Sequence, residues 1–366
     1  DGIRDYKVTG VQTCALPIYA RRLNLTLSGV APTSSKAVTL RYTDLSAAND
    51  LSGVVQDGSG NDMATIVAPG LNVDTFSSSL SVASLASSYS NVLLTGTAAT
   101  ATGNAGNNRL SVNQPTAVAN VFTGGAGIDA MDAGNGSDIY VIASSGDHTA
   151  AEISDSGTGA TDSDELRFSS ITAGQTLTVF SGDTGIEKVT IGTGTAAAPV
   201  ITATTALNVN AAAAPNALSI SGNNGANLLA GTAFADTLIG NHGNDTLIGG
   251  AGNDTLTGGV GIDVFRFDSS LDGVNNVDRI TDFTVAQGDL IQLENAVFTA
   301  FTTTGALAAT AFAISPAATT AAHRILYNTS TGSLLYDPDG NGLAAATAFA
   351  TLNTGLGLTS ARFTIT

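Results

Sequence analysis

Short runs of alternating apolar and polar residues recur along the chain and predict β-strands. They are LNLTLSGV and AVTLRYTDL near the start, ELRFSS, LTVFSGDTGIEKVTIGTG and ALNVNA in the middle, and DVFRF, DRITDF and GDLIQL further on. Two more runs, HRILYN and GSLLYD, flank a turn at residues 330–333. No apolar stretch approaches the ~18 residues that a membrane-spanning helix needs. The pattern predicts an all-β protein built from short strands separated by turns.

The strongest regularity is a repeat of nine residues. Five units open in register at Gly222, Gly231, Gly240, Gly249 and Gly258. Position six carries Asn227, Asp236, Asp245, Asp254 and Asp263, and position eight carries Leu229, Leu238, Leu247, Leu256 and Phe265. The last three residues of each unit predict a short strand whose position-eight side chain points inward and stacks on its equivalents.

Glycine and aspartate at these positions indicate a cation site. Glycine in the first half of each unit permits positive φ and tight curvature, so that successive carbonyl groups can face one centre. The carboxylate at position six adds a charged oxygen. Hard oxygen ligands with no His or Cys cluster nearby select Ca²⁺ over Zn²⁺ or copper. The predicted metal-site residues of this array are Gly231, Asp236, Gly240, Gly243, Asn244, Asp245, Gly249, Gly250, Gly252, Asn253, Asp254, Gly258, Gly259, Gly261 and Asp263.

A degenerate array of the same kind covers residues 103–141. Its units open at Gly103, Gly124 and Ala133, and a twelve-residue unit lies between the first two. The predicted metal-site residues here are Gly124, Gly125, Gly127, Asp129 and Asp138. The segment between the two arrays, residues 142–221, is expected to continue as β-coils or to form a small sandwich.

These units resemble the RTX (repeat-in-toxin, hemolysin-type) calcium-binding family. The resemblance implies a parallel β-roll with two nonapeptides per coil, in which each ion lies between turns and bridges a repeat and the next but one. Asn227, Asp245 and Asp263 would then line one side of the roll, and Asp236 and Asp254 the other. Asn227 and the Ala233–Phe234 pair depart from the family pattern, which predicts weaker binding at this end of the array.

Composition narrows the choice of partner and activity. The 366 residues include 42 Gly and carry a formal net charge of -17, with 13 Lys+Arg against 30 Asp+Glu. This chain lacks the basic patch that nucleic acid or an anionic membrane would need, so cations are its natural counter-partner. The motifs H-E-x-x-H, G-x-S-x-G and GK[ST] are absent, and the three His residues are scattered, with His242 expected to be a solvated turn residue. We predict no catalytic site.

The N-terminal region has three predicted parts. Residues 1–18, DGIRDYKVTGVQTCALPI, resemble a translated short-read sequencing adapter and include the only Cys, so we expect the native chain to begin near Tyr19 as part of a longer protein. The segment LTLSGVAPTSSKAVTLRYTDLSAANDLSGVVQDGSGNDMATI resembles the second half of immunoglobulin-like repeats of bacterial surface proteins, which predicts a truncated repeat over residues 19–75. Residues 76–102, rich in Ser, Ala and Thr, are predicted to be a linker.

The main array covers residues 222–267. The region that follows it, residues 268–366, resembles the β-rich C-terminal segment of RTX exporter substrates, which implies an uncleaved type I secretion signal. The family often has an acidic residue where Arg362 stands. Residues 337–342, DPDGNG, fit the first six positions of an EF-hand loop, but the twelfth position is Ala348. An ordinary acidic turn and an additional Ca²⁺ site both stay open.

These features predict a secreted, extracellular protein whose folding is controlled by Ca²⁺. Without the ion, stacked carboxylates repel and glycine-rich turns lose much entropy on ordering, so the rolls should stay unfolded. The expected partners are calcium ions, a type I secretion exporter and a cell-surface or matrix ligand, and nucleic acid is excluded. The parent is predicted to be an adhesin or surface-layer component. The alternative is an RTX protease or lipase whose catalytic domain precedes this chain.

Overall fold

The computed structural model describes residues 6–8, 25–27, 75–79, 82, 85, 89–157, 159, 162–195 and 198–366. Two three-residue strands near the start, β1 (Tyr6–Val8) and β2 (Leu25–Leu27), pair in parallel. Otherwise, the segments predicted to be adapter-derived (1–18) and immunoglobulin-like (19–75) lie outside the described residues, apart from Thr75.

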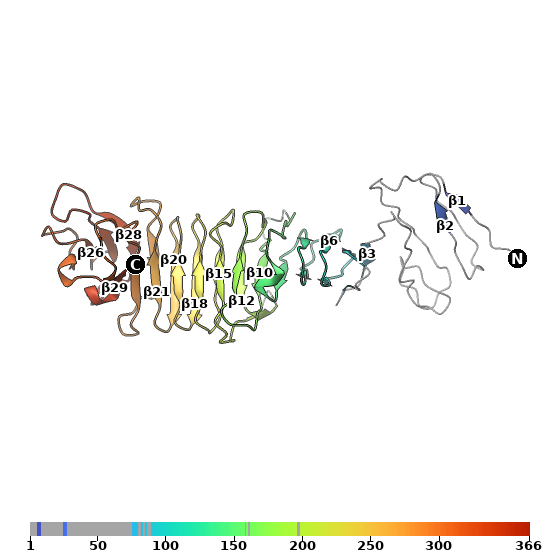
Figure 1. Ribbon diagram of the computed structural model, residues 1–366, viewed down its shortest axis with the longest axis horizontal. Coiled ribbons are helices and arrows are strands. Elements are labelled where there is room, and N and C mark those ends of the chain that lie inside the picture. The colour runs from blue at the N-terminus through green and yellow to red at the C-terminus, as the bar shows by residue number, and fades with distance from the viewer. Residues whose placement is uncertain are drawn as a thin grey trace.

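The remainder is a solenoid whose short strands stack side by side along its long axis (Figure 1). One face is a 13-stranded sheet, in the spatial order β5 (Thr100–Thr102), β7 (Val121–Thr123), β9 (Ile139–Ile142), β10 (Glu165–Phe168), β12 (Lys188–Ile191), β16 (Ser219–Ser221), β18 (Thr237–His242), β20 (Thr255–Val260), β22 (Asp278–Ile280), β28 (Thr347–Thr351), β27 (Ser333–Tyr336), β26 (Ile325–Tyr327) and β25 (Phe312–Ala313). The other face begins with a four-stranded sheet of β3 (Thr75–Ser78), β4 (Asn91–Thr95), β6 (Arg109–Asn113) and β8 (Ala130–Asp132). It continues as an eight-stranded sheet of β11 (Thr176–Thr178), β15 (Asn208–Asn210), β17 (Leu228–Ala230), β19 (Thr246–Ile248), β21 (Val264–Phe267), β23 (Leu290–Leu293), β29 (Phe363–Ile365) and β24 (Gly305–Ala306).

Few other elements interrupt the coils. The strands β13 (Thr193–Gly194) and β14 (Pro199–Val200) form a small antiparallel pair. Three single-turn 3₁₀ helices are η1 (Ser145–Asp147), η2 (Ala309–Ala311) and η3 (Ser360–Arg362). Among the described residues, no helix has the length and apolar character needed to cross a membrane.

Parallel pairing in register stacks identical positions of successive coils. In one sheet Ile220 aligns with Leu238 and Leu238 with Leu256; in the other Leu229 aligns with Leu247. All of these side chains, and Phe265 in the next coil, are fully buried. The prediction that position eight points inward and stacks is confirmed. Each fully buried leucine contributes about 1.5–3 kcal/mol, so this column is the main apolar support of the coils.

The solenoid extends beyond the nonapeptide arrays in both directions. Between the arrays, β10 and β12 join β9 to β16 in one continuous parallel sheet, so this segment forms β-coils and not a separate sandwich. The predicted linker at residues 76–102 also differs from the structure, because β4 and β5 are coils of the solenoid and Val92, Leu94 and Ala101 are fully buried. The small side chains of this segment pack a narrow interior, so its composition resembles that of a linker.

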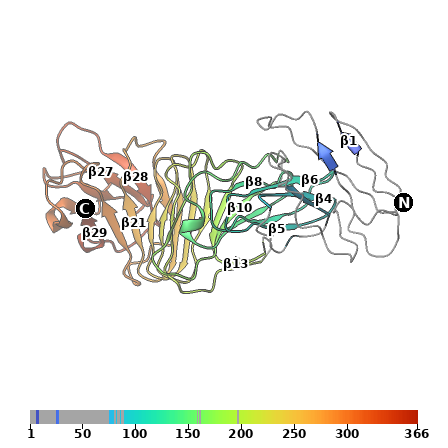
Figure 2. The same ribbon diagram turned by 45° about the vertical axis from the view of Figure 1, so that its right-hand side comes forward.

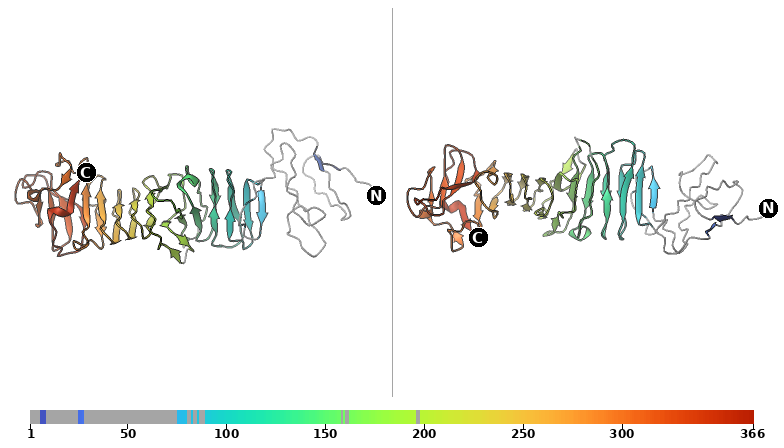
Figure 3. Two further views of the ribbon diagram at one scale, coloured as in Figure 1. Left: turned by 60° about the horizontal axis from the view of Figure 1, so that its bottom comes forward. Right: turned by 90° about the horizontal axis from the view of Figure 1, so that it is seen from above.

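Antiparallel strands close the C-terminal end of the stack (Figures 2 and 3). β26 and β27 form a hairpin around the predicted turn at residues 330–333, and β27 also pairs antiparallel with β28. β28 lies parallel to β22, and β24 lies antiparallel to β29. Strands of changed direction end the parallel register and cover the last coil, as capping elements of repeat proteins do.

Candidate calcium sites

Each position-six carboxylate stands directly before an inward-facing strand and links two coils. One of its oxygens, Oδ1, accepts the backbone N–H of the equivalent residue one coil earlier. Asn227 N–H donates to Asp245 at 2.7 Å, and Asp245 N–H donates to Asp263 at 2.9 Å. On the other face Asp236 N–H donates to Asp254 at 2.8 Å. The two sets form two carboxylate ladders, with the members on each side that the family resemblance implies.

The second oxygen of several ladder carboxylates has no hydrogen-bond partner. Oδ2 of Asp129, Asp138, Asp245 and Asp254 is buried and unpaired. A buried oxygen of a carboxylate that receives no donor is costly unless a cation balances it. These oxygens are therefore the atoms that a bound metal ion would satisfy.

The first glycine of each unit makes room for this oxygen. A Cβ built on Gly240 would lie 2.4 Å from Asp245 Oδ2 and 2.5 Å from the Gly258 carbonyl oxygen. A Cβ on Gly231 would lie 2.3 Å from the Gly249 carbonyl oxygen and 2.6 Å from Asp236 Oδ2. A carboxylate and a turn carbonyl thus converge where a side chain would otherwise begin, and both are hard oxygen donors of the kind that Ca²⁺ takes.

Positive φ, which we predicted for the first half of each unit, belongs to positions two and four only. It occurs at Asn241, Gly243, Gly250, Gly252, Gly259 and Gly261 in the main array and at Gly125, Gly127, Gly134 and Gly136 in the degenerate one. Gly240, Gly249 and Gly258 at position one do not adopt it. Glycine at position one therefore serves close approach, whereas glycine at positions two and four serves the turn.

Asn244 and Asn253, which we predicted to be site residues, hold the coils together on the outside. Both are exposed, and their Oδ1 atoms accept the backbone N–H groups of Ile262 at 2.9 Å and Val277 at 2.8 Å. Their side chains thus tie the outer surface of one turn to the next, while Asp245 and Asp254 face inward.

Burial raises the pKa of the ladder carboxyl groups. The pKa of Asp245 rises to about 7 and that of Asp138 to about 8, in each case mainly because burial disfavours the charged form. Neighbouring carboxylates, Asp263 for the first and Asp164 for the second, raise the pKa further, while donated backbone N–H bonds lower it. A divalent cation would favour the ionised form that burial disfavours.

The N-terminal end of the main array satisfies its polar groups without an ion. At position six of the first unit the Asn227 amide nitrogen donates to the Leu207 carbonyl at 2.7 Å. In the second unit Thr232 donates to Asp236 Oδ2 from its backbone N–H at 2.6 Å and from its hydroxyl at 2.9 Å. Both arrangements reduce the need for a cation, in line with the predicted weakening at this end.

Sequence reasoning missed the ladder members outside the nonapeptides. Asp164, Glu187 and Asp289 also stand directly before strands, and Asp278 is the first residue of β22. Each of the four accepts the backbone N–H of the preceding ladder residue. Their spacing, for example 26 residues from 138 to 164, breaks the nine-residue period. An acidic residue directly before an alternating strand, as in D-ELRF or D-LIQL, was the signal available.

His148 was also missed. It is buried between Glu152 Oε2, 3.1 Å from Nδ1, and Asp183 Oδ2, 3.0 Å from Nε2. Asp183 Oδ1 accepts the backbone N–H groups of Glu152 and Ile153. At this point an imidazole supplies the positive charge between two acidic groups.

The EF-hand-like segment is organised as a turn. Asp339 Oδ2 accepts the backbone N–H groups of Leu343 at 2.9 Å and Ala344 at 3.0 Å, and Asp337 Oδ1 accepts the N–H of Asp339. These bonds hold the pKa of the exposed Asp339 carboxyl below its usual range. The contacts favour the ordinary acidic turn over an additional Ca²⁺ site.

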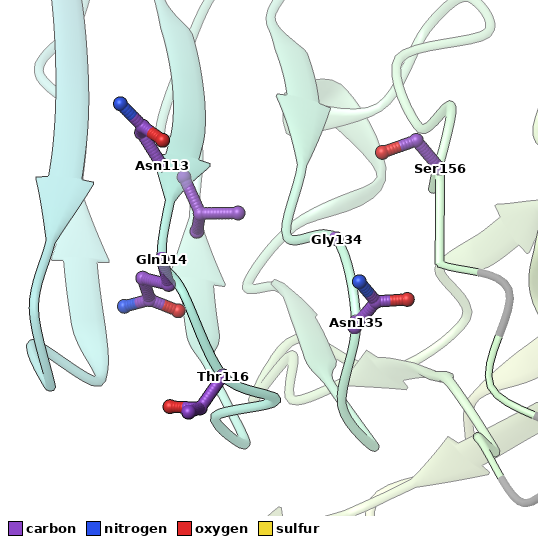
Figure 4. Close-up of a pocket in the computed structure, with 7 residues that line it drawn as sticks. Asn113, Gln114, Thr116, Gly134, Asn135 and Ser156 are labelled. Atoms are coloured by element: carbon purple, nitrogen blue, oxygen red, sulfur yellow. The ribbon is translucent and has the colours of Figure 1, made fainter.

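A shallow polar hollow lies on the solenoid beside the degenerate array (Figure 4). Three successive coils supply its lining, with Asn113, Gln114 and Thr116 from the first, Gly134 and Asn135 from the second and Ser156 from the third. The polar side chains that line it are amides and hydroxyls, and none of its lining residues carries a carboxyl, imidazole or amino group.

Fold and ladders together define a calcium-binding parallel β-roll. The chain matches a family model described as RTX calcium-binding nonapeptide repeat (4 copies). The matches cover residues 116–141, 221–256 and 231–265. The chain therefore carries RTX calcium-binding repeats, and the predicted all-β parallel β-roll and Ca²⁺ are confirmed. RTX repeats are typical of secreted proteins. A search of curated proteins gives no significant match.

Proposed function

We propose that this chain is a structural module that folds on extracellular Ca²⁺ after type I export. The observation that carries the proposal is the pair of ladders in which buried carboxylate oxygens of Asp245 and Asp254 lack any donor. Only the folded coils bring Asp245 Oδ2 and the Gly258 carbonyl of the next coil to the same place. Ion binding is therefore coupled to folding by mass action.

The ion concentration sets where folding takes place. Extracellular calcium modules typically bind with dissociation constants of about 10⁻⁴–10⁻³ M, whereas cytosolic calcium is far scarcer. The chain would pass an exporter unfolded and then stack its coils outside the cell. The antiparallel strands β26 to β28 would close the roll, in the region that carries the proposed secretion signal.

We further propose a non-catalytic role for these residues, as part of an adhesin or surface-layer type protein. The described carboxylates of the ladders accept hydrogen bonds from backbone N–H groups of neighbouring coils, which gives them a structural role. A rigid roll of this kind spaces and stiffens whatever is attached to it. The sequence resemblance at residues 25–66 to immunoglobulin-like repeats of surface proteins supports the adhesin over the enzyme.

Far-UV circular dichroism of the full chain tests the coupling. We expect a weak β signal in excess EGTA and a cooperative gain of β signal on raising free Ca²⁺ to ~1 mM, the extracellular range. Mg²⁺ at the same concentration is the control, because it prefers a tighter octahedral site. An equally folded spectrum in EGTA would contradict the proposal.

A further inference from the structure

Three carboxylates converge where the degenerate array ends, and two of them, Asp155 and Asp164, lie outside the segments that match the RTX model. One oxygen from each of Asp138, Asp155 and Asp164 lies within 4.8 Å of the others. Asp138 and Asp164 are buried and directly precede β9 and β10, which are neighbouring parallel strands. Asp155 is half-buried and comes from the segment after β9. Only Asp138 belongs to a nonapeptide.

A second observation shows that this cluster is incomplete. Asp138 has no exposed surface, its Oδ1 accepts the backbone N–H of Asn120 at 2.6 Å, and its Oδ2 has no partner. No ion pair among the described residues involves any of the three carboxylates. The nearby cations Arg167 and Lys188 pair with Glu165 instead. Negative charge is therefore concentrated here without a protein counter-charge.

The remaining contacts fix Asp155 in place. The Tyr140 hydroxyl donates to Asp155 Oδ2 and accepts the backbone N–H of Ala133 at 2.9 Å. The Gly157 N–H donates to Asp155 Oδ1 at 2.6 Å. A Cβ on Gly157 would lie 2.5 Å from the Gly134 carbonyl oxygen and 2.9 Å from Asp155 Oδ1. This reproduces, without a nonapeptide, the convergence of carboxylate and carbonyl oxygens found at position-one glycines.

We propose that Asp138, Asp155 and Asp164 form an additional Ca²⁺ site, to which the Gly134 carbonyl is positioned to contribute. Three carboxylates and a carbonyl are hard oxygen ligands, which suit Ca²⁺ and exclude softer metals. The ion would join the last coil of the degenerate array to the first coil of the segment that follows. It would thereby keep the solenoid continuous where the repeat pattern is interrupted.

Native mass spectrometry of the full chain in Ca²⁺ counts the ions directly. Asp155→Asn and Asp164→Asn should each bind one ion fewer than the wild type, since both keep the side-chain volume and an acceptor oxygen while removing a charge. Asp268→Asn removes the same charge at a site that only pairs with Arg266, and it should keep the full count. A full count in both cluster variants, with the fold intact by circular dichroism, overturns the proposal. A wild type that binds no Ca²⁺ would instead overturn the calcium-dependent function as a whole.

Tb³⁺ luminescence supplies a second readout that does not depend on the fold of the Asp variants. Tb³⁺ replaces Ca²⁺ and emits when a nearby tyrosine is excited, and the Tyr140 hydroxyl contacts the cluster through Asp155. Tyr140→Phe should lower the sensitised emission by about half or more, while Tyr336→Phe at the far end of the roll should not. Unchanged emission in Tyr140→Phe would overturn the proposal even if the Asp variants fail to fold.

Discussion

At the residue scale, the unit of function is a glycine and an aspartate five positions apart. Gly240 and Asp245 show the arrangement, since the missing side chain of the first makes space for Oδ2 of the second. Glycine is required at this position because it has no Cβ. Its backbone angles do not require it, since its φ is not positive. An alanine there would meet two oxygen atoms at less than contact distance.

Gly240→Ala should therefore lose one calcium ion and lower the free energy of unfolding in saturating Ca²⁺ by about 1–3 kcal/mol, the usual cost of overpacking a tight site. Urea unfolding and ion counting check the two effects. The matched control is Gly357→Ala, because a Cβ on Gly357 meets nothing within 4 Å and its φ is not positive. Equal stability of the two variants would contradict the role given to position one.

His148 supplies a prediction about pH at the same scale. Burial alone would lower its pKa, but the hydrogen bonds that His148 donates to Asp183 and Glu152 outweigh burial and raise the pKa from 6.5 to about 9. The folded state then holds a proton that the unfolded chain loses near pH 6.5. This contribution to stability is fully present below about pH 6.5 and is lost as the pH rises through 9.

Urea unfolding in saturating Ca²⁺ between pH 6 and 10 tests this. The wild type should lose more stability over this range than His148→Gln, and at pH 6 the substitution should cost about 3–5 kcal/mol, as for a broken buried ion pair. His242→Gln, at the exposed end of β18, is the control and should follow the wild type. Parallel pH profiles for the wild type and His148→Gln would contradict a charged His148.

At the scale of elements, neighbouring coils differ in how far they depend on the ion. Asp245 Oδ2 has no donor, whereas Asp236 Oδ2 receives two from Thr232. The coil at Asp236 is thus partly satisfied by the protein. The dependence of the coils on the ion therefore increases from the first units of the array to the later ones.

Asp245→Asn should weaken Ca²⁺ binding at its site by about tenfold or more, because ligand charge sets affinity in such sites. Asp236→Asn should have the smaller effect, since its second oxygen already has protein donors. Isothermal titration calorimetry of the two variants makes the comparison. An equal loss in both would show that Thr232 does not substitute for the ion.

The same scale shows how much the sequence alone could predict. The period of nine fixed the inward stack of Leu238 and Leu247 and the two sides of the roll, because both follow from a repeated spacing. Asp164 and Glu187 were not predicted as ladder members. Their coils are longer, so their spacing differs from nine residues although their place in the coil is the same. The burial of Ala101 was not predicted, because a segment of small residues can be buried in a thin solenoid and still have the composition of a linker.

At the scale of the whole molecule, the two ladders form a column of negative charge inside a low-dielectric interior. Burial raises the pKa of both Asp245 and Asp263, and a neighbouring carboxylate raises it further, Asp263 for the first and Asp289 for the second. The parallel sheets, stacked leucines and closing strands cannot form without bringing these carboxyl groups together. In the function proposed above, calcium is therefore part of the core, because it balances the carboxylates that the fold stacks.

Hydrogen–deuterium exchange of the full chain, with and without Ca²⁺ at pH 7, tests this claim most directly. The backbone N–H groups of Asn227, Asp236 and Asp245 donate to carboxylates one coil later, so their exchange reports whether the ladders exist. We expect strong protection of these amides in ~1 mM Ca²⁺ and near-random-coil exchange in excess EGTA. Equal protection in both conditions would contradict it, because the ladders would then form without the ion.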